Sequence, residues 1–207
     1  MRRWVWLLGI VGLFLVAWWV GLQLRLLPYP KPDIARLEAR ARAFCAEKGV
    51  AYPLEQPAVR IEKHRRRLIL LGRGTPIAEF PIALSGAPEG DKQREGDRRT
   101  PEGDYYVCEK HPSRRFYLFL GLSYPALKDA ERGKAQGQIS EAHYRAIREA
   151  IQSGTCPPWD TPLGGAVGIH GGGVGRDWTL GCIALPDEAV EILYVLLPIG
   201  TPVRIVP

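Results

Sequence analysis

Two residues that together can activate a nucleophile stand at the ends of one glycine-rich segment: a histidine, His170, and a cysteine, Cys182. Short apolar runs lie beside both residues, and such runs bounded by glycine predict buried strands joined by a flexible loop. This loop can bring the two side chains together, although they are twelve positions apart. An imidazole beside a thiol takes the thiol proton or holds the pair as thiolate and imidazolium, which makes the sulfur a nucleophile.

A pair of this kind, taken alone, is more often a coincidence of a buried cysteine and an unrelated histidine. The surrounding glycines favour chemistry, because they let a substrate backbone approach closely. We expect the amides of Gly181 and Cys182, or those of the loop 171–175 with Gly172 and Gly173, to donate to a developing oxyanion.

The chain is long enough for one domain and a tail or anchor, with 207 residues of which 46% are hydrophobic and 24% charged. A packed core is therefore expected. The net charge of +6 favours anionic surroundings such as membrane headgroups or cell-wall polymers. We expect no nucleic-acid partner, because no nucleic-acid-binding motif is recognisable.

Residues 1–27 are predicted to be a membrane anchor. Arg2 and Arg3 precede an uncharged run over residues 4–24, about the length that crosses a bilayer as a helix, with tryptophans near both ends. A cleaved signal peptide has a shorter apolar region and a small-residue cleavage site, and neither is present. We therefore expect a retained single-pass helix, whose orientation depends on the argument from function.

Residues 28–57 are predicted to form a proline spacer followed by an amphipathic helix that Asp33 caps. Residues 58–207 then read as one mainly β domain with peripheral helices, an α+β class. We expect an antiparallel meander, with strands over 58–63, 67–71, 75–84, 104–109 and 115–122, and a helix inserted over 140–152. After the Cys182 strand, Asp187 is expected to cap a helix over 188–197, before a last strand over 202–206.

Four short sequence motifs follow one another along the chain. They are a first strand pair around Val59 and Arg67, Gly-Asp-x-x-Thr-Pro-Glu-Gly at 96–103, Ile-His-Gly at 169–171 and Thr-x-Gly-Cys-Ile-x-Leu at 179–185. Together they resemble the L,D-transpeptidase catalytic-domain (YkuD-like) family of cysteine enzymes, which act on bacterial peptidoglycan. The resemblance covers nearly all of the chain from Ala58 onward and implies an L,D-transpeptidase-like β-sandwich or barrel.

The resemblance also implies an activity. Cys182 is then the nucleophile that forms an acyl-enzyme with peptidoglycan stem peptides, His170 is its base, and the Gly171 carbonyl fixes the His170 tautomer. No cofactor and no metal are implied. The expected substrate-binding residues are Gly172, Gly173, Arg176, Trp178, Thr179, Gly181 and Tyr105. Exposed arginines are more often merely solvated, and core packing explains Trp178 and Tyr105 equally well.

Two positions depart from the common family pattern, which has Ser-His-Gly-Cys and an arginine two residues after the cysteine. Leu180 and Ala184 stand at these positions here, and the loop between His170 and Cys182 is short for the family. These features resemble a branch that includes hydrolases of the link between peptidoglycan and a wall-linked lipoprotein. Transpeptidation, hydrolysis of peptide or lipoprotein links and an inactive wall-binding module all stay open.

The resemblance implies a domain in the periplasm, on the outer side of the bacterial inner (cytoplasmic) membrane, where conditions are oxidising. One disulfide among Cys45, Cys108 and Cys156 is expected, and Cys108–Cys156 is the first choice. A zinc site formed by Cys156, His170 and Cys182 is the weakest alternative, because the paired Cys-x-x-Cys spacing of zinc sites is absent.

Overall fold

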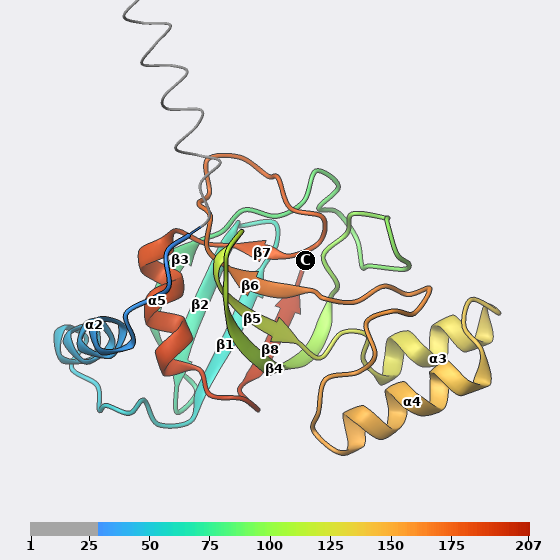
Figure 1. Ribbon diagram of the computed structural model, residues 1–207, viewed down its shortest axis with the longest axis horizontal. Coiled ribbons are helices and arrows are strands. Elements are labelled where there is room, and N and C mark those ends of the chain that lie inside the picture. Colours follow the sequence, from blue (N-terminus) through green and yellow to red (C-terminus); the bar gives the residue numbers. More distant parts are fainter. Residues whose placement is uncertain (1–28) are drawn as a thin grey trace, which may run out of the picture. The chain divides into compact units, whose positions relative to one another are not determined.

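The computed structural model describes residues 29–207, and residues 31–207 form one compact unit. Its frame in this part of the chain is a mixed half-barrel sheet of eight strands, in the order β3-β2-β1-β8-β4-β5-β6-β7 (Figure 1). The strands are β1 (Pro57–Glu62), β2 (Arg67–Gly72), β3 (Thr75–Pro81), β4 (Gly103–Ser113), β5 (Tyr117–Leu122), β6 (Gly168–His170), β7 (Ile183–Ala184) and β8 (Pro202–Val206). The helices are α2 (Ile34–Glu47), α3 (Leu127–Ala135), α4 (Glu141–Gln152) and α5 (Asp187–Leu196).

Strand β1 follows the predicted alternation at residues 59–61. Val59 and Ile61 of β1 are buried and Arg60 between them is exposed, so one face of the strand packs into the core. β1, β2 and β3 pair antiparallel in chain order. β3 lies at the sheet edge, where Pro76 and Pro81 are tolerated because one side of the strand needs no ladder partner.

The sheet is mixed, whereas the sequence indicated an antiparallel meander. β8 pairs parallel with β1 and β7 pairs parallel with β6, while β4 and β5 form an antiparallel hairpin. Two parallel neighbours need a crossover connection between them. Here most of the domain lies between β1 and β8, and the glycine-rich loop connects β6 to β7. Long-range pairing leaves no mark on the local hydrophobic period, which explains the error.

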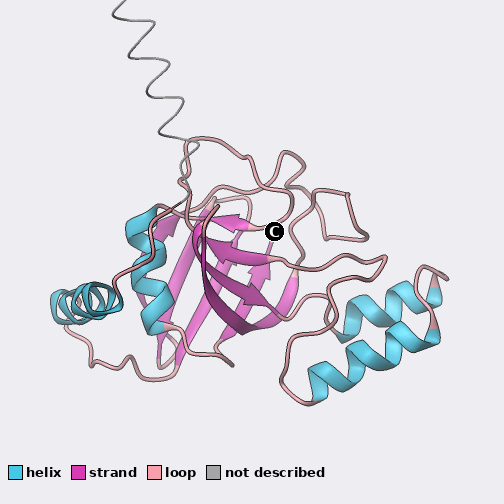
Figure 2. Cartoon of the chain, viewed as in Figure 1, coloured by secondary structure: helices cyan, strands magenta, loops and turns pink. Residues whose placement is uncertain are grey.

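Two helices, α2 and α5, lie together at one side of the sheet (Figure 2). Asp33 caps α2 through two backbone amides of its first turn, as predicted. Glu191 of α5 is 2% exposed, and its carboxylate forms ion pairs with Arg36, at 2.9 Å, and with Arg40. The helix of residues 34–47 is therefore docked on the domain by both apolar and charged contacts.

The insertion between β5 and β6 holds two helices, α3 and α4, although the sequence predicts only the second. They pack around a small core of Ala130, Ile139, Ile147 and Leu163. Helix α3 escaped prediction because it is short, mostly polar and interrupted by Gly133, against which Leu163 packs closely. A disulfide joins Cys108 of β4 to Cys156 after α4, which is the pairing that the sequence favoured.

No helix within residues 29–207 is long and apolar enough to cross a membrane. The predicted anchor, residues 1–27, lies outside the described residues. It remains a prediction from the sequence.

Candidate active site

Strand pairing brings His170 and Cys182 to one face of the sheet. His170 ends β6, and the register of β6 with β7 pairs it with Ala184. Paired residues of neighbouring strands point to the same side of a sheet. Cys182 lies two residues before Ala184, so alternation along the extended chain directs its thiol to the face that carries the imidazole.

The imidazole of His170 belongs to a cross-strand row of rings. The strand registers place His111, Phe119 and His170 side by side on β4, β5 and β6. Ring centroids are 5.1 Å apart from His111 to Phe119 and 6.4 Å apart from Phe119 to His170. Phe116 stacks on His170 at 4.4 Å and Trp178 meets it edge-on at 5.4 Å. This packing fixes the plane of the imidazole and leaves the residue 1% exposed.

A hydrogen bond decides which nitrogen of His170 can act as a base. Nδ1 lies 2.6 Å from the Gly171 carbonyl, so Nδ1–H donates to it and Nε2 keeps its lone pair. The Gly171 amide donates to the Phe116 carbonyl at 3.0 Å, which anchors the same residue on the β4–β5 turn. Burial lowers the pKa of His170 to about 4; the Gly171 bond opposes this shift, and the charge of Arg115 adds to it. The imidazole is therefore neutral near pH 7.

The thiol of Cys182 is protonated near pH 7. The residue is half-buried, and its Sγ donates to the Ala166 carbonyl at 3.5 Å. Burial of the sulfur raises the pKa of Cys182 to about 11, although the Gly168 amide and the charge of Lys92 act in the opposite direction. No hydrogen bond joins this thiol to the His170 ring, and both residues lie in the described part of the chain. The arrangement fits general-base catalysis better than a resting thiolate–imidazolium pair.

Thr179 holds the turn before the nucleophile. Its Oγ1 donates to the Cys182 carbonyl at 2.8 Å and accepts from the Gly181 amide at 3.3 Å. The Gly181 amide, expected at an oxyanion, is therefore already engaged, and Thr179 is buried rather than exposed to a substrate. The Cys182 amide makes no hydrogen bond within residues 29–207, which leaves it available as an oxyanion donor.

The glycine loop is tied to helix α5. Asp187 Oδ1 accepts from the Gly172 amide at 2.8 Å, and this carboxylate does not cap α5 as the sequence suggested. A side chain on Gly171 would lie 2.5 Å from the same oxygen, which explains the glycine at that position. The Gly173 amide donates to the Leu185 carbonyl at 2.9 Å. Both loop amides are satisfied within the protein, so neither is a free oxyanion donor.

Trp178 and Arg176 play different parts in the loop. Trp178 donates from Nε1 to the Gly173 carbonyl at 3.1 Å and packs on His170, so it helps to hold the imidazole in place. Arg176 is exposed, and it forms no ion pair with any carboxylate of residues 29–207. The structure therefore gives Arg176 no contact with His170 or Cys182.

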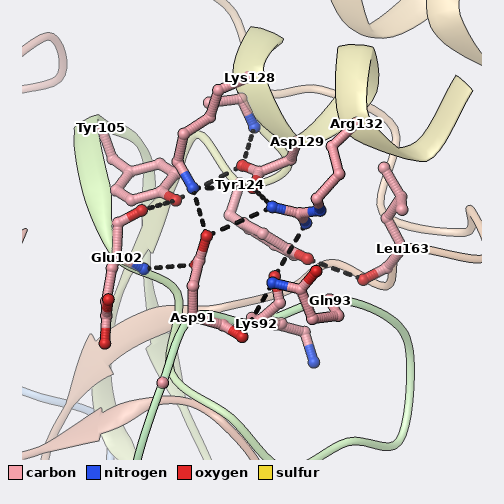
Figure 3. A network of polar contacts seen from close by, with 12 residues as sticks. Asp91, Lys92, Gln93, Glu102, Tyr105, Tyr124, Lys128, Asp129, Arg132 and Leu163 are labelled. Carbon is pink, nitrogen blue, oxygen red and sulfur yellow. Dashed lines mark hydrogen bonds and ion pairs between the residues drawn. The ribbon is translucent and has the colours of Figure 1, made fainter. Parts of the chain in front are cut away.

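Tyr105 does not line the site. It is 4% exposed, and its hydroxyl donates to the Glu102 carbonyl at 3.0 Å (Figure 3). Beside it the fully buried Asp129 forms ion pairs with Lys128 at 3.0 Å and Arg132 at 3.2 Å. Burial raises the pKa of the Tyr105 hydroxyl far above its usual range. Strand alternation turns this ring into the core, which corrects the expectation that it contacts a substrate.

A polar loop over residues 91–100 supports the turn at the nucleophile. Asp97 organises this loop, because its carboxylate accepts from three backbone amides and binds Lys92 Nζ at 2.8 Å. Burial disfavours the charged carboxylate, but these bonds outweigh it and lower the pKa of Asp97. Arg132 of the buried network donates to the Lys92 carbonyl at 2.9 Å (Figure 3). At the other end of the loop, a side chain on Gly181 would lie 2.8 Å from the Arg99 carbonyl.

Several of these residues were assigned no role from the sequence. Asp97 lies inside the Gly-Asp-x-x-Thr-Pro block, so the resemblance pointed to the segment without saying what its carboxylate does. Phe116 and Lys92 carry no local signal, because their contacts depend on the pairing of β5 with β6 and on the fold of the loop.

The zinc alternative fails on one of its three ligands. Cys156 is bonded to Cys108 and has no free thiolate. Among the described residues, no group of three or more metal-ligating side chains is arranged to hold an ion.

Comparison with known proteins found one matching family model and several similar solved structures. A sequence model of the L,D-transpeptidase catalytic domain (YkuD) matches residues 56–205. No curated protein sequence matches the chain. The solved structure of the helical cell shape determining protein Pgp2 from Campylobacter jejuni has a TM-score of 0.51 and 23% identity, over 84% of this chain and 56% of that one. This similarity shows a shared fold.

Two further solved structures are more distant. Bd1075 from Bdellovibrio bacteriovorus has a TM-score of 0.49 and 17% identity, over 75% of this chain and 49% of its own. The L,D-transpeptidase from Xylanimonas cellulosilytica has a TM-score of 0.45 and 15% identity, over 75% and 63%. The chain spans about half to two-thirds of the length of these three proteins.

Proposed function

Because this chain belongs to the L,D-transpeptidase catalytic-domain family, we propose that it is a cysteine acyltransferase acting on peptidoglycan stem peptides. The observation that carries the proposal is the Cys182 amide, which has no hydrogen-bond partner among residues 29–207 and lies beside its own half-buried thiol. The thiol is directed to the face of the sheet that carries the neutral imidazole of His170. On this proposal, Cys182 supplies the nucleophile and the oxyanion donor, and His170 supplies the base.

The reaction begins with Cys182 Sγ attacking the carbonyl at the L-centre of a diaminopimelate residue. His170 Nε2 takes the thiol proton as the C–S bond forms, and the Cys182 amide donates to the oxyanion. The intermediate collapses to a thioester, the C–N bond breaks, and the imidazolium returns its proton to the leaving amine. An incoming amine then attacks the thioester, its proton passes to Nε2, and the thiol is released with a new amide.

Hydrolysis is the second candidate, with water in place of the incoming amine. It is favoured by Leu180, which stands where the common family pattern has a second imidazole and is 71% exposed beside the nucleophile. Ala184 likewise replaces the usual arginine and is fully buried. On this alternative the product is a shortened stem peptide or a released wall-linked lipoprotein.

We also propose that the domain works outside the cytoplasm, held by the N-terminal segment at the bacterial inner membrane. The Cys108–Cys156 disulfide supports this location, because such bonds persist in oxidising compartments. In protein isolated without reductant and then denatured, a thiol titration is expected to give two free cysteines, Cys45 and Cys182. Four free thiols would contradict the proposed location. We also propose that this protein contributes to cell shape, the role for which the helical cell shape determining protein Pgp2 is named.

The deciding experiment treats isolated sacculi with the protein and determines the masses of the muropeptides. New links between diaminopimelate residues indicate transpeptidation, and shortened peptides or released lipoprotein fragments indicate hydrolysis. Cys182→Ala is expected to abolish either product, whereas Cys45→Ala, which changes the other free cysteine of the described chain, is expected to keep it. Unchanged muropeptides with the unaltered protein would contradict the proposed activity.

A further inference from the structure

The exposed Arg115 and the imidazole of His170 both stack against the ring of Phe116. Arg115 occupies the turn between β4 and β5, with its guanidinium carbon 5.2 Å from the centroid of the Phe116 ring. The Phe116 ring in turn stacks on the His170 imidazole at 4.4 Å and an interplanar angle of 26°. Cation, ring and imidazole therefore form a stack at the tip of the hairpin. The charge of Arg115 also reaches His170, whose pKa it helps to lower.

Nothing within the described residues neutralises this cation. Arg115 forms no ion pair with a carboxylate of residues 29–207. Elsewhere in the domain, Arg66 binds Asp177 and Arg67 binds Glu79, both at 2.8 Å. The carboxylate of Asp187, in the first turn of α5, is hydrogen-bonded to the Gly172 amide. A positive group beside a buried site, with no internal partner, is available to an anionic ligand.

We propose that Arg115 recognises a free carboxylate of the substrate beside the bond under attack. The proposal rests on the proposed function, which supplies a stem peptide with such groups. Ala184 has no charge to offer at the family's usual arginine position, and it is fully buried. Stacking on Phe116 restricts the guanidinium, which lowers the cost of ordering it on a ligand, and its planar fork matches a carboxylate.

Two carboxylates of a stem peptide have this chemistry. One is the terminal carboxylate of the D-residue that leaves, and the other is the side-chain carboxylate of the diamino acid. Three synthetic tetrapeptides separate them: one with both groups free, one amidated at the terminus and one amidated at the side chain. The amide that removes the dependence on Arg115 identifies the carboxylate that it binds.

Binding is measured by calorimetry with the full chain carrying Cys182→Ala, so that no turnover occurs. Adding Arg115→Gln is expected to weaken the peptide with free carboxylates by about 10- to 100-fold, the loss of a hydrogen bond to a charged group. The same change is expected to leave one amidated peptide unaffected. Arg115→Lys, which keeps the charge but loses the fork, is expected to recover part of the affinity. The matched control is Arg148→Gln on α4, since Arg148 is also exposed and lies 5.8 Å over a ring, that of Tyr144.

The inference is overturned if Arg115→Gln binds the free peptide within about twofold of its parent protein. It is also overturned if the change weakens all three peptides equally, as a purely structural role on Phe116 predicts, or if the parent binds no peptide. Activity is measured separately, in protein that retains Cys182. If binding depends on Arg115 but Cys182 is never acylated, the proposed function is contradicted and the inference about Arg115 is still supported. With turnover, Arg115→Gln is expected to raise KM for the free peptide more than it lowers kcat.

Discussion

The Arg99 carbonyl lies so close to Gly181 that a Cβ on the glycine would be 2.8 Å from its oxygen. Gly181 also has φ of +137°, a conformation that side chains rarely adopt. The residue before the nucleophile is therefore restricted to glycine by both backbone and neighbour.

Gly181→Ala is expected to cost about 1–3 kcal/mol of unfolding free energy and to displace the Cys182 amide, so that Cys182 acylation slows at least about tenfold. Urea unfolding and the rate of acylation by a reactive β-lactam check this. Gly86→Ala is the control, since a side chain there meets nothing within 4 Å. Equal behaviour of the two variants would show that the Arg99 contact does not position the nucleophile.

The charge state of the thiol is tested by its alkylation. Because the pKa of Cys182 is raised to about 11, the thiolate fraction should increase about tenfold per pH unit from about pH 7 to pH 10. Iodoacetamide reactivity is expected to follow that slope in Cys45→Ala protein, which keeps Cys182 as the free thiol of the described chain. A rate already at its plateau near pH 6 would instead reveal a thiolate–imidazolium pair.

His170 makes folding stability depend on pH. The ordinary pKa of 6.5 applies to the unfolded chain and about 4 to the folded one, so the unfolded state binds more protons between these values. The stabilisation is complete above about pH 6.5 and is lost as the pH falls towards 4, by about 3 kcal/mol. Urea unfolding across this range is expected to show a steeper decline for the unaltered protein than for His170→Asn. Parallel declines would mean that the imidazole titrates normally.

The ion pair of Asp97 and Lys92 is expected to matter more than a surface pair. Side-chain exposures are 10% and 4%, and Asp97 also accepts three backbone hydrogen bonds. Asp97→Ala leaves a buried, unpaired ammonium and is expected to cost about 3–5 kcal/mol. In comparison, Asp104→Ala removes an exposed pair with Arg204 at 3.5 Å and should cost less than about 1 kcal/mol. Chemical denaturation of both variants measures the difference, and similar losses would contradict the assigned role of the loop.

Local pattern was sufficient to predict much of the fold. The alternation around Val59 and Ile61 predicted β1, and Asp33 with its apolar stripe predicted α2. The flanking glycines and apolar runs located β6, which ends at His170, and β7, which follows Cys182 directly. These features depend on neighbours in the sequence, which is why they are visible without a structure.

The remaining features depend on distant contacts. Asp187 resembles a helix cap in sequence, but folding brings the Gly172 amide within reach, and the carboxylate binds it instead. Thr179 competes in the same way for the Gly181 amide and so alters the expected oxyanion site. Tyr105 and Phe116 are both aromatic residues on the β4–β5 hairpin, and only strand register decides that one enters the core while the other supports the base.

β7 has only two residues, and Cys182 precedes the first of them. Cys182 is thus carried by a loop whose other end is the His170 strand, and contacts such as that of Asp187 with the Gly172 amide and that of Arg66 with Asp177 hold the loop between these ends. We therefore expect insertions between residues 174 and 176, outside these contacts, to preserve the strand order of the sheet and with it the folding of the domain.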